Sequence, residues 1–218
     1  MLKKLLRMDA SDGFVLLFPT GIFLVMQLIT VGVLLIGKPD TCVLISPVVL
    51  LVVAVILSLL LVGSHGIVTF EQAIRMGTTR RKALGLVMGL AAIEAALLFA
   101  VGALLSGLEQ LLGHFVWPVL LPGVEIHNFI TVLPWWSYGA AFAGSMVAGF
   151  IGGAGIQRFG GKFGWGLWCV WMGWFLLNNR LPWKSEEMVP VVIPVVAILV
   201  LILLFWSVWS YLHAVIRR

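Results

Sequence analysis

The sequence predicts an all-α integral membrane protein with six transmembrane helices and with both ends of the chain in the cytoplasm. The first observation is composition, since 61% of the 218 residues are hydrophobic and only 11% are charged. A soluble domain carries about a quarter charged residues, and a chain of this length could not bury so much apolar surface away from water. The second observation is that the apolar residues form six long runs, each bounded by short segments with charged residues, glycine or proline.

The six predicted spans form one transmembrane domain over residues 1–218. Their approximate bounds are 14–37, 43–63, 82–107, 129–153, 163–177 and 189–215. The first run is longer than the roughly 7–15 residues of a signal-peptide core and is not followed by an A-x-A-like site, so we expect an uncleaved span. The segment 108–128 is too apolar for a free loop, and we expect it to lie on the outer membrane surface or to dip into it.

The basic residues determine the predicted orientation. With six spans and a cytoplasmic N-terminus, eleven Lys and Arg residues fall on the inner side and three on the outer side. This bias follows the positive-inside rule, because a charge misplaced at mid-bilayer costs about 2–3 kcal/mol. The cations also lie in short clusters at the ends of apolar runs. The net charge of +5 therefore indicates membrane topology and not nucleic-acid binding.

One polar, basic segment between the second and third spans has the features of a docking site. Residues 69–77 are expected to form a short amphipathic helix, with Glu71 and Arg75 as an i,i+4 pair and Gly77 as its stop. The next helix would be capped by a threonine and enter the membrane at its basic first turn. A turn that only holds topology needs no amphipathic helix, so we favour docking of a partner. The residues expected to contact it are Phe70, Glu71, Ile74, Arg75, Met76, Thr79, Arg80 and Arg81.

The same segment resembles a known family. Its sequence from Phe70 to Gly85, F-E-Q-A-I-R-M-G-T-T-R-R-K-A-L-G, is similar to the cytoplasmic segment of ABC-2-type permease subunits of ATP-binding-cassette exporters. There an aromatic residue and a short helix precede a G-x-T-R element. The stretch Gly149–Lys162, G-F-I-G-G-A-G-I-Q-R-F-G-G-K, is similar to the G-R-F-G type of loop before the fifth span of that family. The six-span plan matches over essentially the whole chain, which looks most similar to small exporters of peptides such as bacteriocins and phenol-soluble modulins.

The resemblance implies a division of labour between subunits. Residues 69–77 would be the coupling helix, seated in a groove of a separate ATPase, and two ATPase copies would rock a dimer of permeases. The chain itself has no P-loop, because the nearest stretch has Ile156 in place of a glycine and Phe163 in place of a hydroxyl residue. ATP and Mg would thus be bound by the partner, and we expect no catalysis, cofactor or metal here. We expect a homodimer in the bacterial plasma membrane that exports a hydrophobic or amphipathic cargo, of the antimicrobial or toxin peptide type.

Four residues inside the predicted spans are candidates for the translocation pathway: Gln27, Glu94, Trp168 and Trp171. Glu94 is the only acid within a predicted span, roughly 20 Å along a helix from Arg81, and no span carries a basic residue at that depth. It faces a cavity, meets its copy across a dimer, or is a protonated side chain bonded to a neighbouring helix, and the sequence leaves these alternatives open. Helix–helix hydrogen bonding is favoured for Gln27, and packing is favoured for the two tryptophans.

Small residues at four-residue spacing permit close helix crossing, and we favour packing within the chain over a dimer seam. The pairs are Gly85/Gly89, Ala91/Ala95, Ser145/Gly149 and Gly149/Gly153. Two alternative functions remain. A vitamin-binding membrane subunit of an energy-coupling-factor importer would leave the amphipathic coupling segment unexplained. A small integral-membrane enzyme is disfavoured by the lack of a polar cluster within the spans.

Overall fold

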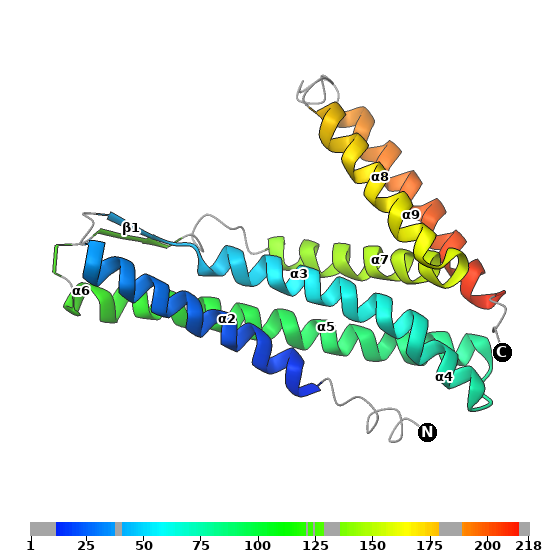
Figure 1. The fold of residues 1–218 in the computed structure, drawn as a ribbon, viewed down its shortest axis with the longest axis horizontal. Coiled ribbons are helices and arrows are strands. Elements are labelled where there is room, and N and C mark those ends of the chain that lie inside the picture. The colour runs from blue at the N-terminus through cyan, green and yellow to red at the C-terminus, as the bar shows by residue number, and fades with distance from the viewer. Residues whose placement is uncertain are drawn as a thin grey trace. The chain divides into compact units, whose positions relative to one another are not determined.

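The computed structural model describes residues 12–37, 41–120, 122–123, 125–128, 136–178 and 189–213. These residues form long helices and one two-stranded sheet (Figure 1). The main elements are α2 (Asp12–Gly32), β1 (Thr41–Leu44), α3 (Ser46–Ser64), α4 (Phe70–Arg75), α5 (Arg80–Leu111), α6 (Trp117–Leu120), β2 (Glu125–Asn128), α7 (Trp136–Phe159), α8 (Gly161–Asn178) and α9 (Val189–Leu212). Three π-helical turns join them: η1 (Val33–Gly37), η2 (His65–Thr69) and η3 (Leu112–Val116).

Contacts divide the chain into two compact units. The first unit contains Met1–Leu61 and Leu90–Met146, and the second contains Val62–Gly89 and Val147–Arg218. The unit boundaries fall inside α3, α5 and α7, because these long helices each contribute residues to both.

Five helical segments among the described residues are long and apolar enough to cross a membrane. They are Leu17–Ile36, Ser46–Arg75, Arg80–Val119, Trp136–Phe159 and Pro194–Leu212, at the places of the first, second, third, fourth and sixth predicted spans. At the place of the fifth, α8 is a helix of 18 residues with four glycines and four tryptophans, and it is not among the segments that are long and apolar enough to cross a membrane. Tryptophan prefers the membrane interface to the hydrocarbon core. Each of the six runs forms a helix over most of its described residues, and five of them meet the length and apolarity of a span.

Several boundaries differ from the predicted ones. The second span was predicted to begin at residue 43, but Val43 and Leu44 lie in β1 and the helix begins at Ser46. The predicted separate helix over 69–77 is the end of the helix that begins at Ser46, because backbone angles at Ser64, Thr69 and Phe70 stay helical through η2. The third helix extends to Leu111, so the start of the predicted outer segment is helical. α7 ends at Phe159 and α8 begins at Gly161, so the predicted basic loop shrinks to Gly160, whose φ is +65°. The predicted start of the fourth span, residues 129–135, lies outside the described residues.

The short sheet was not predicted. β1 and β2 pair in parallel, in a register that runs from Thr41 opposite Glu125 to Leu44 opposite Asn128. Each strand has four residues, too few for a recognisable alternation of side chains. Pairing satisfies backbone groups that would be costly to leave unbonded at an apolar surface. The sheet thus ties the segment before α3 to the segment that follows α6, both within the first unit.

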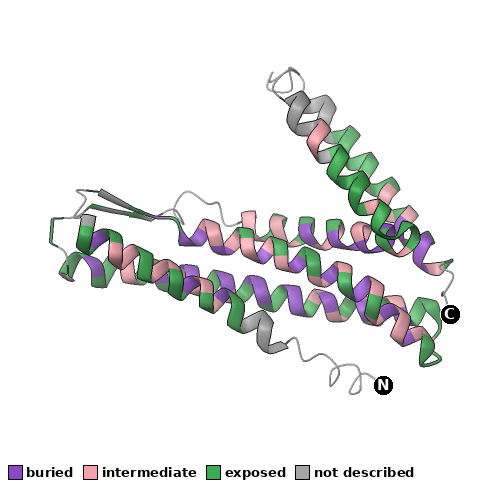
Figure 2. Cartoon of the chain, in the orientation of Figure 1, coloured by how far each residue is buried: buried purple, intermediate pink, exposed green. Residues whose placement is uncertain are grey.

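The core of the first unit lies where α3, α5 and α7 meet. Ala54, Leu98 and Phe99 are buried there, and Phe99 meets Phe142 edge to face with ring centroids 5.7 Å apart. Beside them, the hydroxyls of Ser58 and Ser145 are hydrogen-bonded at 3.0 Å. Figure 2 shows buried residues along α3 and α5, whereas α8 and α9 are exposed along most of their described length.

The small residues fall into two groups. Ala91 and Ala95 are fully buried, which confirms their use in packing within the chain. In the second unit, a Cβ on Gly63 would come within 3.7 Å of the carbonyl oxygen of Gly149, so α3 and α7 approach closely there. Gly85 and Gly89 are exposed with open space around them.

Candidate functional site

The predicted docking segment folds as a helix end followed by a tight turn. Gly77 has a φ of +84°, its N–H donates to the carbonyl of Ile74 at 2.9 Å, and the N–H of Thr78 donates to Ala73 at 3.1 Å. These two bonds are those of a Schellman motif, which stops a helix at a glycine because glycine adopts the left-handed conformation without strain. The helix of α5 then begins after Thr79, whose carbonyl accepts from the N–H of Ala83 at 2.8 Å. Gly77 therefore ends α4 as predicted.

The predicted contact residues divide between an outer and an inner face. Glu71 and Arg75 form the predicted i,i+4 ion pair at 3.5 Å, with 62% of the Arg75 side chain exposed. The outer face consists of residues that the chain does not cover. Five of them are exposed, namely Arg75, Met76, Thr79, Arg80 and Arg81, and Glu71 and Ile74 are half-buried. Phe70, by contrast, is completely buried. An amphipathic helix has to cover its apolar side, and here the chain itself covers the part that carries Phe70.

Tyr211 is the residue that covers Phe70. Its ring lies 5.1 Å from that of Phe70, edge to face, and 5.1 Å from that of Phe150, nearly parallel. Tyr211 is completely buried, and its hydroxyl makes no hydrogen bond with any described residue. The ring fits because α3–η2 and α7 present glycines to it, since a Cβ at Gly66 or Gly153 would collide with the hydroxyl. Tyr211 was not predicted to take part, because nothing local in the sequence marks which residues of α9 meet α4.

A second link joins the turn to α9. The guanidinium of Arg80 donates a hydrogen bond of 2.8 Å to the backbone carbonyl of Leu212, at the end of α9. The end of a helix leaves carbonyls unpaired, and a cation there is favoured by the helix dipole. A shallow depression of about 550 Å³ lies at this point, between Thr79–Arg81 and Leu212–His213. The turn is therefore a basic surface fixed at two places to the last helix.

A buried polar cluster lies in the first unit. Glu109 of α5 is fully buried, and its Oε1 accepts hydrogen bonds from Ser46 Oγ at 2.6 Å and from Gln27 Nε2 at 3.1 Å. The three side chains come from α5, α3 and α2. The Oε2 atom of Glu109 and the Oε1 atom of Gln27 are also buried and have no hydrogen-bond partner among the described residues. A bonded polar group that joins three helices is costly to disrupt in an apolar setting.

This cluster changes the interpretation of two residues. Gln27, a predicted pathway residue, takes part in helix–helix hydrogen bonding, the role favoured for it. Glu109 was assigned to the outer segment, and its burial among helices was missed because only the extension of α5 beyond residue 107 carries it there. The prediction that the spans hold no polar cluster was wrong for this reason.

The other pathway candidates lie on α5 and α8. Glu94 is buried on α5 at 4% exposure. Trp168 is half exposed on α8. The side chain of Trp171 lies outside the described part of the structure.

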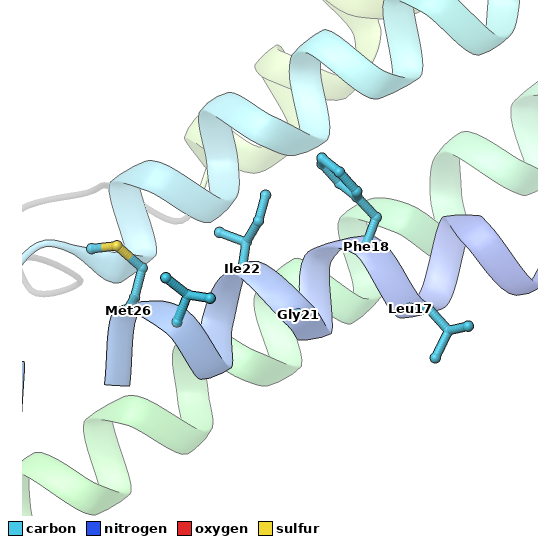
Figure 3. Close-up of a pocket in the computed structure, with 6 residues that line it drawn as sticks. Leu17, Phe18, Gly21, Ile22 and Met26 are labelled. Carbon is cyan, nitrogen blue, oxygen red and sulfur yellow. The ribbon is translucent and has the colours of Figure 1, made fainter. Parts of the chain in front are cut away.

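One apolar groove of about 520 Å³ runs along α2, where Gly21 leaves a gap in the row of larger side chains (Figure 3). Its lining residues are Leu17, Phe18, Gly21, Ile22, Val25 and Met26. All of them come from one helix and none is charged, so the groove suits lipid or another apolar helix and offers no chemistry. Within the described residues, no group of three His, Cys, Asp or Glu side chains could hold a metal ion.

Comparison with known proteins gives no match. No protein-family model matches the chain, and no curated protein and no solved structure is significantly similar to it.

Proposed function

We propose that this chain is the membrane-spanning permease subunit of an ATP-binding-cassette exporter, powered by a separate ATPase that docks on the turn after α4. One observation carries the proposal: the turn exposes basic and apolar side chains, yet it is fixed to α9 through both Phe70 and Arg80. A loop that only connected two spans would need no such attachment.

The two attachments suit a mechanical role. A segment that receives force from an ATPase has to pass it on to a transmembrane helix, and a loosely held loop would bend instead. Here Phe70 meets Tyr211 of α9, and Tyr211 stacks on Phe150 of α7. A displacement of α4 would reach α9 and α7 through packed rings, which resist compression. The bond from Arg80 to Leu212 adds a second connection at the start of α5.

The proposed arrangement has six spans with both ends in the cytoplasm of a bacterial plasma membrane. The distribution of basic residues supports it, and in this proposal α8 supplies the remaining span beside the five segments that are long and apolar enough to cross a membrane. Two copies of the chain, each bound to one ATPase, would enclose a pathway for a hydrophobic or amphipathic peptide. Neither nucleic acid nor a metal has a place in this proposal.

The docking is tested by co-purification with a candidate ATP-binding-cassette ATPase from the same genome, followed by ATP-turnover assays. Ile74→Asp and Arg75→Glu are expected to weaken assembly or turnover at least tenfold, because they place new negative charge on the docking face. Lys38→Glu makes the same change of net charge in a sequence segment predicted to lie on the outer side of the membrane, and should leave assembly intact. Normal assembly and turnover in both Ile74→Asp and Arg75→Glu would exclude docking through this segment.

Transport assays with the reconstituted complex test the cargo. Outward, ATP-dependent movement of a labelled amphipathic peptide is expected, without movement of small hydrophilic solutes. Vitamin uptake in the inward direction, with docking unaffected by substitutions at the turn, would favour an energy-coupling-factor importer instead.

A further inference from the structure

A second groove, in the second unit, combines a basic end with an apolar floor. It has a volume of about 610 Å³ and lies at the junction of α7 and α8. Arg158 and Lys162 line one end, and Gly166, Leu167 and Val170 line the other. Lys162, Gly166 and Val170 are spaced by four residues, so they form one stripe about 12 Å long on α8. Neither the candidate docking turn nor the polar cluster of Glu109 includes these residues.

The cation at the head of the groove is held in place by aromatic rings. The guanidinium carbon of Arg158 lies 4.9 Å from the ring centre of Trp209 and 5.9 Å from those of Phe159 and Trp206. Such contacts orient a guanidinium while leaving its N–H groups free to bond an anion. Arg158 is exposed and forms no ion pair with any described residue. It is therefore preorganised for an external anion.

No acid of the chain competes for these cations in the described part of the second unit. That part contains six Lys and Arg residues but one acid, Glu71, which already pairs with Arg75. The described charges of this unit are thus predominantly positive, and an anion that binds Arg158 displaces no ion-pair partner among the described residues.

We propose that this groove binds one anionic phospholipid. The phosphate bonds to Arg158 and Lys162, and an acyl chain lies along the α8 stripe over Gly166 and Val170. Basic pockets beside apolar helix faces are suited to such headgroups. Gly166 matters because it lowers the floor of the groove, with open space where a Cβ would stand. The proposal requires that the chain lie in a bilayer but is independent of its function as an exporter.

Native mass spectrometry of the full-length chain in detergent, titrated with phosphatidylglycerol or phosphatidylcholine, tests the charged end. We expect phosphatidylglycerol to bind about tenfold more tightly, and Arg158→Gln or Lys162→Gln to weaken it about fivefold each. Lys82→Gln removes an exposed charge of α5 outside the groove and should leave the affinity unchanged. An equal loss in Lys82→Gln would overturn the proposal, since it would show a diffuse charge effect.

The apolar end is tested by filling it. Gly166→Phe is expected to weaken phosphatidylglycerol at least tenfold while both cations remain, whereas Gly164→Phe, on another side of α8, should not. Both glycines have open space around them, so neither change should disturb folding. Inorganic phosphate at millimolar concentration should not displace the lipid. Unchanged lipid affinity in Gly166→Phe, or displacement by free phosphate, would mean that no acyl chain occupies the groove.

Discussion

The rings of Phe70 and Tyr211 meet edge to face, with centroids 5.1 Å apart and planes at 67°, and so attach α4 to the last turn of α9. Aromatic pairs of this geometry contribute about 0.5–1.5 kcal/mol beyond the area they bury. Through this contact Phe70 packs among the helices of the second unit, although in the sequence it belongs to a polar segment. It also leads to the first two predictions.

Phe70→Ala should strongly destabilise the protein. We expect the free energy of unfolding to fall by about 3–5 kcal/mol, because the change leaves a cavity against Tyr211. Phe205→Ala is the matched control, since Phe205 is 77% exposed on α9 and should cost much less. Denaturation of the purified chain in mixed micelles measures both. Similar losses for the two variants would show that Phe70 is not packed as described.

Tyr211→Phe should be neutral or slightly stabilising, because the buried hydroxyl has no hydrogen-bond partner among the described residues. It should also relieve Gly66→Ala in part, because the new methyl group would collide with that hydroxyl, although it would also lie 3.1 Å from the ring carbon Cζ, which phenylalanine keeps. Gly153→Ala should be rescued less, because its Cβ would also lie 3.1 Å from the carbonyl oxygen of Gly63, which is backbone and cannot move aside. A double-mutant cycle on thermal unfolding measures the rescue. Equal rescue at both glycines would contradict this geometry.

Ser46→Ala should cost about 1–3 kcal/mol of unfolding free energy, because Glu109 loses its shortest hydrogen bond while staying buried. Ser207→Ala is the matched control. Ser207 is equally buried, but its hydroxyl bonds only to the carbonyl of Leu203 in its own helix. We expect a change within about 0.5 kcal/mol there. Denaturant titration measures the free energy of unfolding of both variants. Equal losses would mean that the hydrogen bond from Ser46 to Glu109 contributes nothing to stability.

Gly77→Ala should lower stability by about 1 kcal/mol, because its φ of +84° strains any residue with a Cβ. Space is not the limit, since nothing lies within 4 Å of the position that the Cβ would take. Gly85→Ala makes the same change inside α5, also in open space, and should raise stability by about 0.5–1 kcal/mol through helix propensity. Circular dichroism during thermal unfolding measures the stability of both variants. A change of stability in the same direction for both would contradict the described conformation of Gly77.

Local patterns of the sequence determined the helices and the turn after α4. A long apolar run satisfies its backbone hydrogen bonds only as a helix when water is absent, so six runs predicted six helices. The helix stop at Gly77 and the ion pair of Glu71 with Arg75 were also predictable, because each depends only on residues within about one helical turn. The end of α4 at Gly77 follows from glycine alone, but its continuity with α3 does not.

Only the tertiary structure decided which distant side chains meet. Glu109 accepts from Ser46, 63 residues away, and from Gln27, 82 residues away, and Tyr211 lies against Phe70 from the far end of the chain. The pairing of β1 with β2 is of the same kind. The apolar pattern of a sequence predicts that a helix has a face to bury. It does not predict which other helix covers that face, because many helix faces are similarly apolar. Steric fit decided between them, as at Gly66 and Gly153, where the lack of a side chain makes room for one tyrosine.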